Sequence, residues 1–448
     1  MDDTPYDIAL IGGGASGTLV ALHLLRQART PTRLALVEPG TPGRGVAYGT
    51  DFDEHLLNVP AARMSVDPDA PSDFLDYLQT LDPAATAGTF APRRVYAAYL
   101  ADRFAAARAQ ATHATVDVVP ARVVDAEPDA TSVRLHLDDG RTLRAAHAVV
   151  ALGNTPRPLP APAPPGAVIA SWDYRALKAI EPDHDVTIVG AGHSMVDVVL
   201  SLVAQDHRGH VDVLSRTAQL PLPHARAHGA CDFDATTLLT LPLRARVRAL
   251  RSATSEAAAA DVPWQDVMDR VRPQVRALWG SLGDADRRRF LRHVVRAWDV
   301  HRHRIAPSVH ARLQARRESG QLRVHRGRLQ RVLADGARYR VQACTPQGTQ
   351  DEWGCDVVVN AVGLQVQAAR MGHPLLDALL ARGDARPGPH GIGLDTDADA
   401  AVLRADGSAH ARLHAIGSLR IGTLWETIAV PELRQDAQAL ARRLLASV

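Results

Sequence analysis

Asp7-Ile8-Ala9-Leu10-Ile11-Gly12-Gly13-Gly14-Ala15-Ser16-Gly17, near the start of the chain, joins a short apolar run to the spacing Gly12-x-Gly14-x-x-Gly17. A pattern rich in alanine and leucine, typical of a helix, follows from Thr18 to Gln27. In a strand–turn–helix unit, the first glycine makes the tight turn, the second lets a pyrophosphate approach the backbone, and the third lets the helix pack on the strand. Free N–H groups at the helix start would then hold the phosphates.

A second apolar strand is predicted for Arg33–Val37, and it ends in Glu38. This acid lies about 20 residues beyond the loop, where a carboxylate can hold ribose hydroxyls. A bare glycine pattern would indicate little, and a glycine-rich turn without a ligand is the alternative. Together with the strand, the helix, the second strand and the acid, the pattern predicts a dinucleotide-binding domain.

Size and charge limit the classes of protein. A chain of 448 residues indicates two or three domains. Lys+Arg (51) and Asp+Glu (49) nearly cancel, so we expect no nucleic-acid or membrane partner. The acidic start lacks the features of a secretory signal, and no apolar run approaches the length that spans a membrane. We expect a soluble cytoplasmic protein; its oligomeric state is not predicted.

Cysteine and histidine patterns indicate neither a redox dithiol nor a metal site. Cys231, Cys344 and Cys355 form no C-x-x-C pair. His301 and His303 are spaced by two, which does not place both on one helix face. We therefore expect no bound metal.

A second glycine turn is predicted after the apolar stretch 185–189. It reads Gly190-x-Gly192, with Met195 at the third glycine position, so it is incomplete. A helix (193–204) and a strand (211–214) should follow, and the strand ends in Ser215-Arg216 instead of an acid. An arginine there can pair with the 2′-phosphate of NADP, whereas an acid favours NAD. The alternative is a solvated loop arginine.

The remaining pattern is a mixture of strands, helices and one long loop. Residues 39–50 and 55–64 are predicted to form a lid beside the reactive ring of a cofactor, or else a packed surface excursion. Two buried strands that end in glycine, 148–153 and 356–363, are expected to be partners. The final strand, 413–418, precedes a C-terminal helix whose start at Val430-Pro431-Glu432 could face an electron-rich ring or phosphate. Other predicted helices are 71–81, 94–111 and most of 238–304; other predicted strands are 116–119, 122–125, 133–137, 141–144, 322–324, 329–333 and 339–343.

The chain resembles the flavoproteins with two dinucleotide-binding domains. The features that carry this resemblance are the two nested dinucleotide motifs, the two buried strands ending in A-x-G and the final strand and helix. In that superfamily the first motif holds FAD and the inserted one holds NAD(P)H. Gly43–Met64, Trp298–Pro307 and Trp425–Glu432 are similar to the bacterial FAD-NAD(P)-binding family and its members described as FAD-dependent urate hydroxylases. The chain is also distantly similar to N-hydroxylating and Baeyer–Villiger flavin monooxygenases.

The resemblance implies an α/β fold with two nested Rossmann-like domains and a helical insertion. The FAD domain would comprise residues 1–165 and 346–448, and the NAD(P) domain 166–345, with the insertion at about 235–305. Met195 stands where the family has glycine or alanine. The implied FAD-binding residues are Gly12, Gly14, Ala15, Ser16, Gly17, Glu38, Asn58, Val124, Gly153, Gly417 and Thr427. The implied NAD(P)-binding residues are Gly190, Gly192, His193, Ser194 and Arg216.

The implied activity is that of an FAD-dependent oxidoreductase that consumes NADPH or NADH. We expect a monooxygenase that uses O₂ and a flavin hydroperoxide on a small molecule, with urate hydroxylation to 5-hydroxyisourate in purine metabolism as the most specific hypothesis. Catalytic residues are not identified; the candidates are Asn58, Arg63, Arg302, His303 and Trp425. Of these, Arg63, Arg302 and His303 could pair with an anionic ring such as urate, or be ordinary structural residues. The alternatives are a reductase or dehydrogenase without oxygen insertion, an N-hydroxylating monooxygenase, and a flavin-binding sensor.

Overall fold

The computed structural model describes residues 5–448, which form two compact units. The first unit contains the chain up to Thr50, then Pro60–Thr155 and Gln365–Val448. The second contains Asp51–Val59 and Pro156–Leu364. The predicted domain boundaries at 165 and 346 therefore both fall inside the second unit.

An eight-stranded sheet forms the centre of the first unit, with β15, β16, β6, β1, β2 and β3 in spatial order. The strands from β16 to β3 run parallel, β15 is antiparallel to β16, and β4 and β5 continue from β6 as an antiparallel meander. Their bounds are β1 Tyr6–Ile11, β2 Thr32–Val37, β3 Ala114–Val119, β4 Val123–Pro128, β5 Val133–Leu137, β6 Thr142–Val150, β15 Ala401–Leu403 and β16 Ala409–Ala415.

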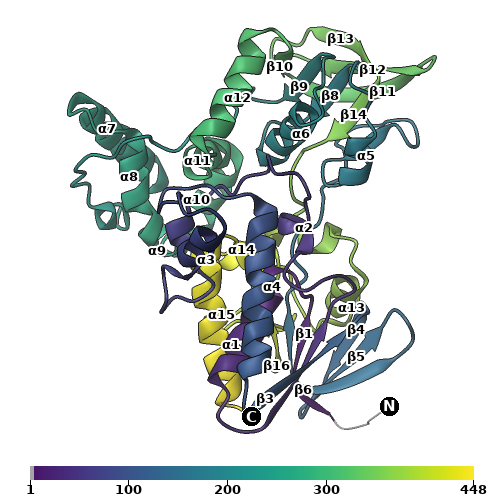
Figure 1. Ribbon diagram of the computed structural model, residues 1–448, viewed down its shortest axis with the longest axis vertical. Coiled ribbons are helices and arrows are strands. Elements are labelled where there is room, and N and C mark those ends of the chain that lie inside the picture. The colour runs from purple at the N-terminus through teal and green to yellow at the C-terminus, as the bar shows by residue number, and fades with distance from the viewer. Residues whose placement is uncertain (1–4) are drawn as a thin grey trace. The chain divides into compact units, whose positions relative to one another are not determined.

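Helices cover the parallel sheet of the first unit. Helix α1 packs against both α4 and α15, and the three lie side by side in Figure 1. On the other face, α13 packs on β4, and Leu375, Leu376 and Leu379 join the core beneath the sheet. The helices of this unit are α1 Ala15–Gln27, α2 Gly45–Tyr48, η1 Ala61–Arg63, α3 Asp73–Leu81, α4 Arg93–Gln110, η5 Ala368–Arg370, α13 Pro374–Arg382, η6 Pro389–Gly391, η7 Gly417–Arg420, α14 Ile421–Leu424 and α15 Val430–Leu445.

This layering explains the apolar run that begins the chain. Successive side chains of a strand point to opposite faces, so a strand covered on both faces is apolar at every position. Ile8, Ala9, Leu10 and Ile11 are all buried, and β1 lies between β2 and β6. The turn after β1 therefore opens at the carboxyl edge of the sheet, where ligands of doubly wound folds bind.

The second unit is built on a five-stranded parallel sheet in the order β10-β9-β8-β14-β7 and a three-stranded antiparallel sheet, β11-β12-β13. The strands are β7 Val168–Ala170, β8 Val186–Val189, β9 Val211–Ser215, β10 Leu322–Arg326, β11 Arg328–Asp335, β12 Arg338–Cys344, β13 Gln350–Cys355 and β14 Val357–Asn360. Its helices outside the insertion are α5 Tyr174–Lys178, α6 His193–Val203 and α12 Pro307–Glu318.

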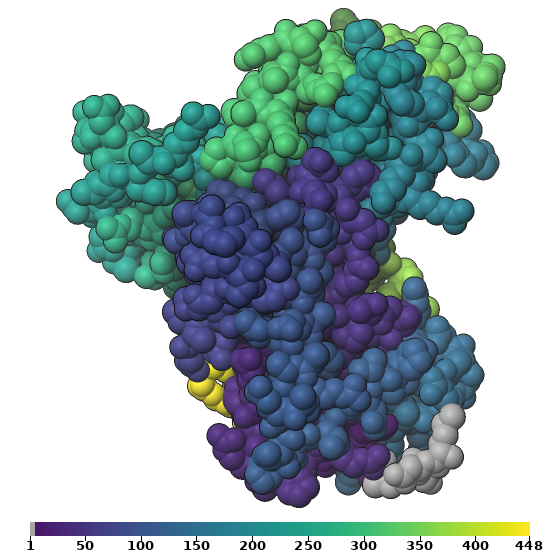
Figure 2. Space-filling view, in the orientation of Figure 1, coloured from purple at the N-terminus to yellow at the C-terminus, as the bar shows by residue number. Residues whose placement is uncertain are grey.

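A helical segment between β9 and α12 forms a lobe of its own within the second unit, seen in teal in Figures 1 and 2. Its helices are η2 Ala235–Leu238, α7 Leu243–Ala259, α8 Trp264–Val271, η3 Arg272–Gln274, α9 Val275–Gly280, α10 Asp284–Arg289, the π-helical turn η4 Phe290–Val294, and α11 Val295–Arg302. No helix within residues 5–448 is long and apolar enough to cross a membrane.

Two sequence predictions need correction. The stretch 356–363 is not a partner of 148–153, because β14 pairs with β8 and β7 in the second sheet. The separate strands expected at 141–144 and 148–153 are one strand, β6, which reaches from the meander into the parallel sheet. The predicted fold class, two Rossmann-like α/β domains with substantial helix, is confirmed.

Candidate functional site

The first glycine turn is shaped by two glycines that no other residue could replace. Gly12 has φ +101°, its N–H donates to the Val37 carbonyl at 2.9 Å, and a Cβ there would lie 2.6 Å from the Ala151 oxygen. A Cβ on Gly17 would lie 1.9 Å from the Gly12 oxygen. These contacts keep the start of α1 against the carboxyl ends of β1, β2 and β6.

Gly14 is different because the space beside it is open. The nearest atom to a Cβ on Gly14 would be the Gly45 Cα at 3.8 Å. Helix α1 starts here with no side-chain cap and no acid in its first turn, so the N–H groups of Ala15 and Ser16 have no capping acceptor. An open backbone and free helix N–H groups fit a diphosphate, as expected for the pyrophosphate of FAD.

Glu38 connects this turn to the loop that follows β2. Its Oε2 accepts from the Gly13 N–H at 2.7 Å, and its Oε1 accepts from the Gly40 N–H at 2.8 Å. A carboxylate offers about four lone-pair sites, so each oxygen can still accept from a ribose hydroxyl. The residue is half-buried at the end of β2, where the sequence places a ribose ligand.

Segments far apart in the sequence meet at the same edge of the sheet. Gly417 has φ +75°, and a Cβ there would lie 2.6 Å from Oγ of Ser16. The Ser418 hydroxyl donates to the Gly153 carbonyl at 2.5 Å. Gly153 has φ +74° and open space beside it. Three predicted FAD residues are thus brought together, and Ser418, which carries no sequence motif, joins them.

The other predicted FAD residues lie on elements around this edge or outside the unit. Val124 is half-buried on β4. Thr427 is fully buried just before α15, and its hydroxyl donates to Asp436 at 3.3 Å. Asn58 belongs to the second unit, where its carbonyl accepts from His224 Nε2 at 2.9 Å. A role of Asn58 in FAD binding stays a prediction.

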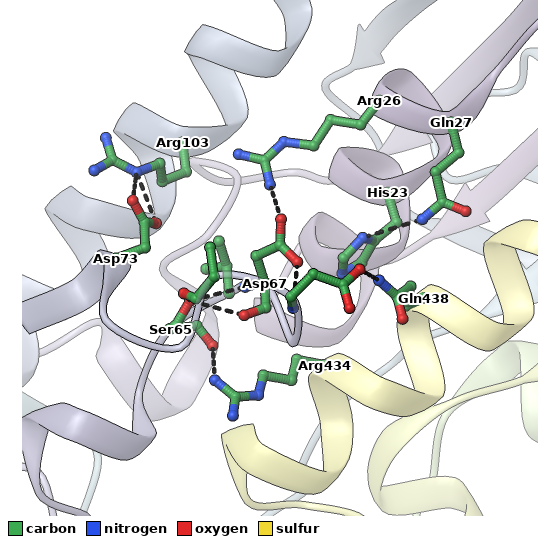
Figure 3. A network of polar contacts seen from close by, with 12 residues as sticks. His23, Arg26, Gln27, Ser65, Asp67, Asp73, Arg103, Arg434 and Gln438 are labelled. Carbon is green, nitrogen blue, oxygen red and sulfur yellow. Dashed lines mark hydrogen bonds and ion pairs between the residues drawn. The ribbon is translucent and has the colours of Figure 1, made fainter.

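A polar network joins the helices that carry this edge (Figure 3). Arg26 on α1 donates to Asp67 at 3.0 Å, and Arg434 on α15 donates to the Ser65 carbonyl at 3.0 Å. Between them, burial lowers the pKa of His23 to about 4, so this imidazole is neutral at pH 7. The loop 65–67 therefore ties the last turn of α1 to the beginning of α15.

The second glycine turn, like the first, has a tightly packed first glycine and open space beside the second. Gly190 has φ +114°, its N–H donates to the Leu214 carbonyl at 2.9 Å, and a Cβ would lie 2.1 Å from the Ala361 oxygen. Gly192 has nothing within 4 Å of a Cβ. His193 and Ser194 start α6, which has no side-chain cap and no acid in its first turn. This turn also fits a dinucleotide diphosphate.

Met195 stands at the third glycine position of the second turn but does not occupy the space beside Gly192. Its side chain is completely buried, and it belongs to the core beneath α6. The third glycine position serves close packing of helix and strand, and here a buried methionine occupies it. The space beside Gly192 stays open, so the incomplete motif leaves the diphosphate position intact.

Arg216 follows β9 and is exposed. Within residues 5–448 its side chain makes no hydrogen bond or ion pair, so its charge is available to a ligand. A second arginine lies within electrostatic reach: burial lowers the pKa of Arg296, the charge of Asp299 raises it, and the charge of Arg216 lowers it. Arg296 was not predicted as a site residue; it lies on α11 and donates to the Ala191 carbonyl at 2.9 Å.

The catalytic candidates do not form one group within either unit. Arg302 and His303 end α11 in the second unit, and burial, followed by Arg302, His193 and Arg272, holds the pKa of His303 well below its usual range. Arg63 is exposed on η1, and Trp425 is half-buried with φ +64° between α14 and α15; both belong to the first unit. A substrate pocket built from these residues stays a prediction.

Cys231, Cys344 and Cys355 are free thiols. Cys344 and Cys355 lie at opposite ends of the β12–β13 pair, opposite Gln350 and Tyr339. Within residues 5–448, no group of three or more histidine, cysteine or acidic side chains could hold a metal ion.

Comparison with known proteins agrees with this geometry. Residues 9–155 match the model of a family described as FAD-NAD(P)-binding. No curated protein sequence matches the chain. Among solved structures, the chain is similar to ornithine N-hydroxylase from Kutzneria sp. 744, seen with reduced FAD, NADP⁺ and L-ornithine (14% identity, TM-score 0.68, 99% of this chain and 100% of that chain).

Two further solved structures show the same likeness. The reduced form of ornithine hydroxylase from Pseudomonas aeruginosa is 16% identical with a TM-score of 0.65, and 99% of each chain is covered. The FAD-bound cadaverine monooxygenase of desferrioxamine biosynthesis from Erwinia amylovora is 14% identical with a TM-score of 0.66, covering 99% of this chain and 95% of that chain. At these identities the likeness establishes the fold, and the predicted resemblance to flavoproteins with two dinucleotide-binding domains is confirmed at that level.

Proposed function

We propose that the protein is an FAD-dependent, NADPH-consuming oxidoreductase, a monooxygenase that acts on a small molecule with O₂. One observation carries this proposal: two glycine turns, each with a tight first glycine and an open second one, start α1 and α6. Paired dinucleotide sites are what hydride transfer from a nicotinamide to a flavin requires.

The chain's own residues would bind and orient the two cofactors. In the first unit, the N–H groups after Gly14 would hold the FAD diphosphate, and Glu38 would accept from the ribose hydroxyls. In the second unit, the N–H groups after Gly192 would hold the NADPH diphosphate. The chemistry supplied by a bound flavin is acceptance of a hydride and delivery of electrons to O₂.

The residues that follow β2 and β9 differ in charge, and this difference bears on which ribose each turn would bind. After β2 stands Glu38, whose negative charge suits an unmodified ribose. After β9 stands Arg216, which is exposed and has no hydrogen bond or ion pair within the described chain. A positive charge without a bound carboxylate favours a ribose 2′-phosphate, so we propose NADPH over NADH.

The cysteines support an acceptor other than a protein disulfide. Electrons from a reduced flavin can pass to a paired dithiol, to O₂ or to an external acceptor. The three thiols are free and two of them are buried, so within the described chain they make no relay. This favours oxygen chemistry over the reductase alternative.

Two classes of substrate are candidates. Urate hydroxylation to 5-hydroxyisourate rests on the family resemblance alone. N-hydroxylation of an amine is the second candidate, because the structures that match both units from end to end include an ornithine N-hydroxylase and a cadaverine monooxygenase. A flavin-binding sensor is the least supported alternative.

The test is a coupled assay on the purified protein after saturation with FAD. We expect a flavin absorbance spectrum, NADPH oxidation faster than NADH oxidation, and stimulation by one member of a panel of urate, ornithine, lysine and cadaverine. Incorporation of one atom of ¹⁸O₂ into product would support the monooxygenase. NADPH oxidation that gives only hydrogen peroxide with every substrate would contradict it, and a protein that binds no flavin would contradict the whole proposal.

A further inference from the structure

One arginine of the helical segment reaches the second glycine turn. Arg296 on α11 is 105 residues from Ala191, and its Nη2 donates to the Ala191 carbonyl at 2.9 Å. The same nitrogen donates to the carbonyl of Gln219, in the loop that follows Arg216. A single guanidinium thus joins the helical segment, the glycine turn after β8 and the loop after β9.

The hydrogen bond to the Ala191 carbonyl affects the orientation of the glycine turn. Ala191 is the middle residue of Gly190-Ala191-Gly192, so its C=O and the Gly192 N–H belong to one planar trans peptide and point in opposite directions. Holding the carbonyl toward Arg296 turns the Gly192 N–H away from it. A Cβ on Gly192 would meet nothing within 4 Å, so the backbone at this residue is open to an approaching ligand.

The charge of Arg296 adds to this geometry. Its recorded hydrogen bonds go to backbone carbonyls, so its positive charge is not neutralised by a bound carboxylate. Burial lowers the pKa of Arg296, the charge of Asp299 raises it and the charge of Arg216 lowers it, so both groups lie within electrostatic reach of the guanidinium. A diphosphate would gain from a positive charge placed behind the loop that binds it.

Helix α11 is built to hold a fixed orientation. It follows directly on the π-helical turn Phe290–Val294, and π-helical turns inside helices occur frequently at functional sites. The Phe290 ring packs edge-on against Trp298 on α11, with centroids 6.1 Å apart, and against Trp279, 5.8 Å apart. At its other end, His303 lies within electrostatic reach of His193, the first residue of α6.

We propose that helix α11 is part of the nicotinamide-nucleotide site, with Arg296 as the positioning residue that holds the Ala191 carbonyl and turns the Gly192 N–H toward the diphosphate. This inference rests on the proposed function of the second glycine turn. It assigns to the helical segment a role in nucleotide binding in addition to any role in substrate binding. Because both nucleotides carry the same diphosphate, Arg296 should serve NADPH and NADH alike, whereas Arg216 should serve NADPH alone.

The experiment compares Arg296→Gln, Arg296→Lys and Arg216→Gln with the exposed control Arg292→Gln. The dissociation constants of NADPH and NADH are measured by anaerobic flavin reduction in the FAD-saturated protein, alongside flavin content and melting temperature. Arg296→Gln should weaken both nucleotides by a similar factor of about 10 to 100, the value of a hydrogen bond to a charged group. Its limiting rate of flavin reduction and its flavin content should change little.

The matched variants decide the interpretation. Arg296→Lys should restore part of the affinity, Arg216→Gln should weaken NADPH alone, and Arg292→Gln should weaken neither nucleotide. Unchanged affinity in a folded Arg296→Gln protein, or a loss confined to NADPH, would overturn the inference. Should that variant fail to fold, a loss of affinity confined to NADPH in Arg296→Lys would overturn it instead. A wild-type protein that binds neither nucleotide would remove the proposed function itself, a different result from all of these.

Discussion

At the scale of single residues, the glycines of one motif do different work. Gly12 and Gly17 are fixed by backbone oxygens 2.6 Å and 1.9 Å from where a Cβ would stand, so they serve the fold. Gly14 has its nearest neighbour at 3.8 Å, so the fold itself would accept a methyl group there. The sequence predicts the three glycines as one motif, and the structure separates the two that shape the turn from the one that has open space beside it.

Gly14→Ala should therefore fold and lose flavin affinity. The backbone of Gly14 has φ −63°, which alanine adopts readily, and the added Cβ would occupy the side left open for the diphosphate. We expect FAD affinity to fall by about tenfold or more, equivalent to about 1.4 kcal/mol. Fluorescence titration of the apoprotein with FAD measures this, and urea denaturation measures stability.

Gly17→Ala is the matched contrast, because its Cβ would collide with the Gly12 oxygen. We expect this variant to lose stability by at least the 1–3 kcal/mol or so that overpacking costs. Gly88→Ala, where the nearest atom lies 4.0 Å away, should change neither property. Wild-type FAD affinity in Gly14→Ala would show that the diphosphate lies elsewhere.

A second residue-scale prediction concerns His414 in the core of the first unit. It is 3% exposed, and burial followed by the neighbouring His147 lowers its pKa from the ordinary 6.5 to about 4. The unfolded chain therefore binds more protons between these pH values. The stabilisation is complete above pH 6.5 and is lost as the pH falls toward 4, by up to about 3 kcal/mol.

His414→Leu tests this linkage. Within the described chain neither ring nitrogen of His414 has a hydrogen-bond partner, so leucine removes the titration without breaking a bond. The drop in the free energy of unfolding between pH 7.5 and pH 5, measured with urea, should be smaller than in the wild type. His23, with a pKa of about 4, should retain its own share. An equal drop in both proteins would contradict the assignment; the exposed His113→Leu should behave as wild type.

At the scale of elements, local pattern predicts most helices and strands but not which sheet a strand joins. The stretches 148–153 and 356–363 have the same apolar, glycine-terminated pattern, yet they enter different sheets. Their partners are fixed by packing against distant strands, which leaves no local signal. The sequence does not predict strand β13, Gln350–Cys355, because its residues are mostly polar and alternate in exposure. The π-helical turn Phe290–Val294, which precedes Arg296, has no sequence pattern that would predict it.

The contact between α3 and α4 gives a prediction at this scale. Arg103 Nε lies 3.0 and 2.9 Å from the two oxygens of Asp73 (Figure 3). The Tyr99 hydroxyl donates to the same carboxylate at 2.5 Å. Burial alone would raise the pKa of Asp73, but these hydrogen bonds outweigh it and lower the pKa. Asp73→Asn should cost about 1–3 kcal/mol of stability, measured by urea denaturation at pH 7.

Asp76→Asn is the control for that prediction. Asp76 is exposed in the same helix and accepts from the Ser72 hydroxyl at 2.8 Å. Surface changes of this kind usually stay within about 0.5 kcal/mol. Equal losses in the two variants would mean that the charge of the first helical turn, and not the contact with α4, is what stabilises α3.

At the scale of the whole molecule, the chain crosses between its units more often than the sequence suggests. Predicted FAD residues from the turn at 12–17, from Gly153 and from Gly417 meet in the first unit, because parallel strands end at one edge. The excursion Asp51–Val59 instead belongs to the second unit. The segments 39–50 and 55–64, predicted together to form a lid, are therefore divided between the two units, and composition alone does not reveal this division.

His55 is the residue that fixes this excursion, and its loss should loosen the segment 51–59. The imidazole is fully buried, its Nε2 lies 2.9 Å from both the Asp197 carbonyl and the Ser201 hydroxyl, and its ring packs against Phe52. His55→Ala should destabilise the second unit by about 2–4 kcal/mol, the usual cost of a large-to-small change in a core. Cleavage by a dilute protease within 51–59 should then rise, because cleavage follows the population of the open form. Asn58→Ala, which alters an exposed side chain of the same segment, should change neither. FAD content should be retained in His55→Ala, since the glycine turn and Glu38 lie in the first unit. A loss of flavin in step with the loss of stability would show that the excursion supports the flavin site as well.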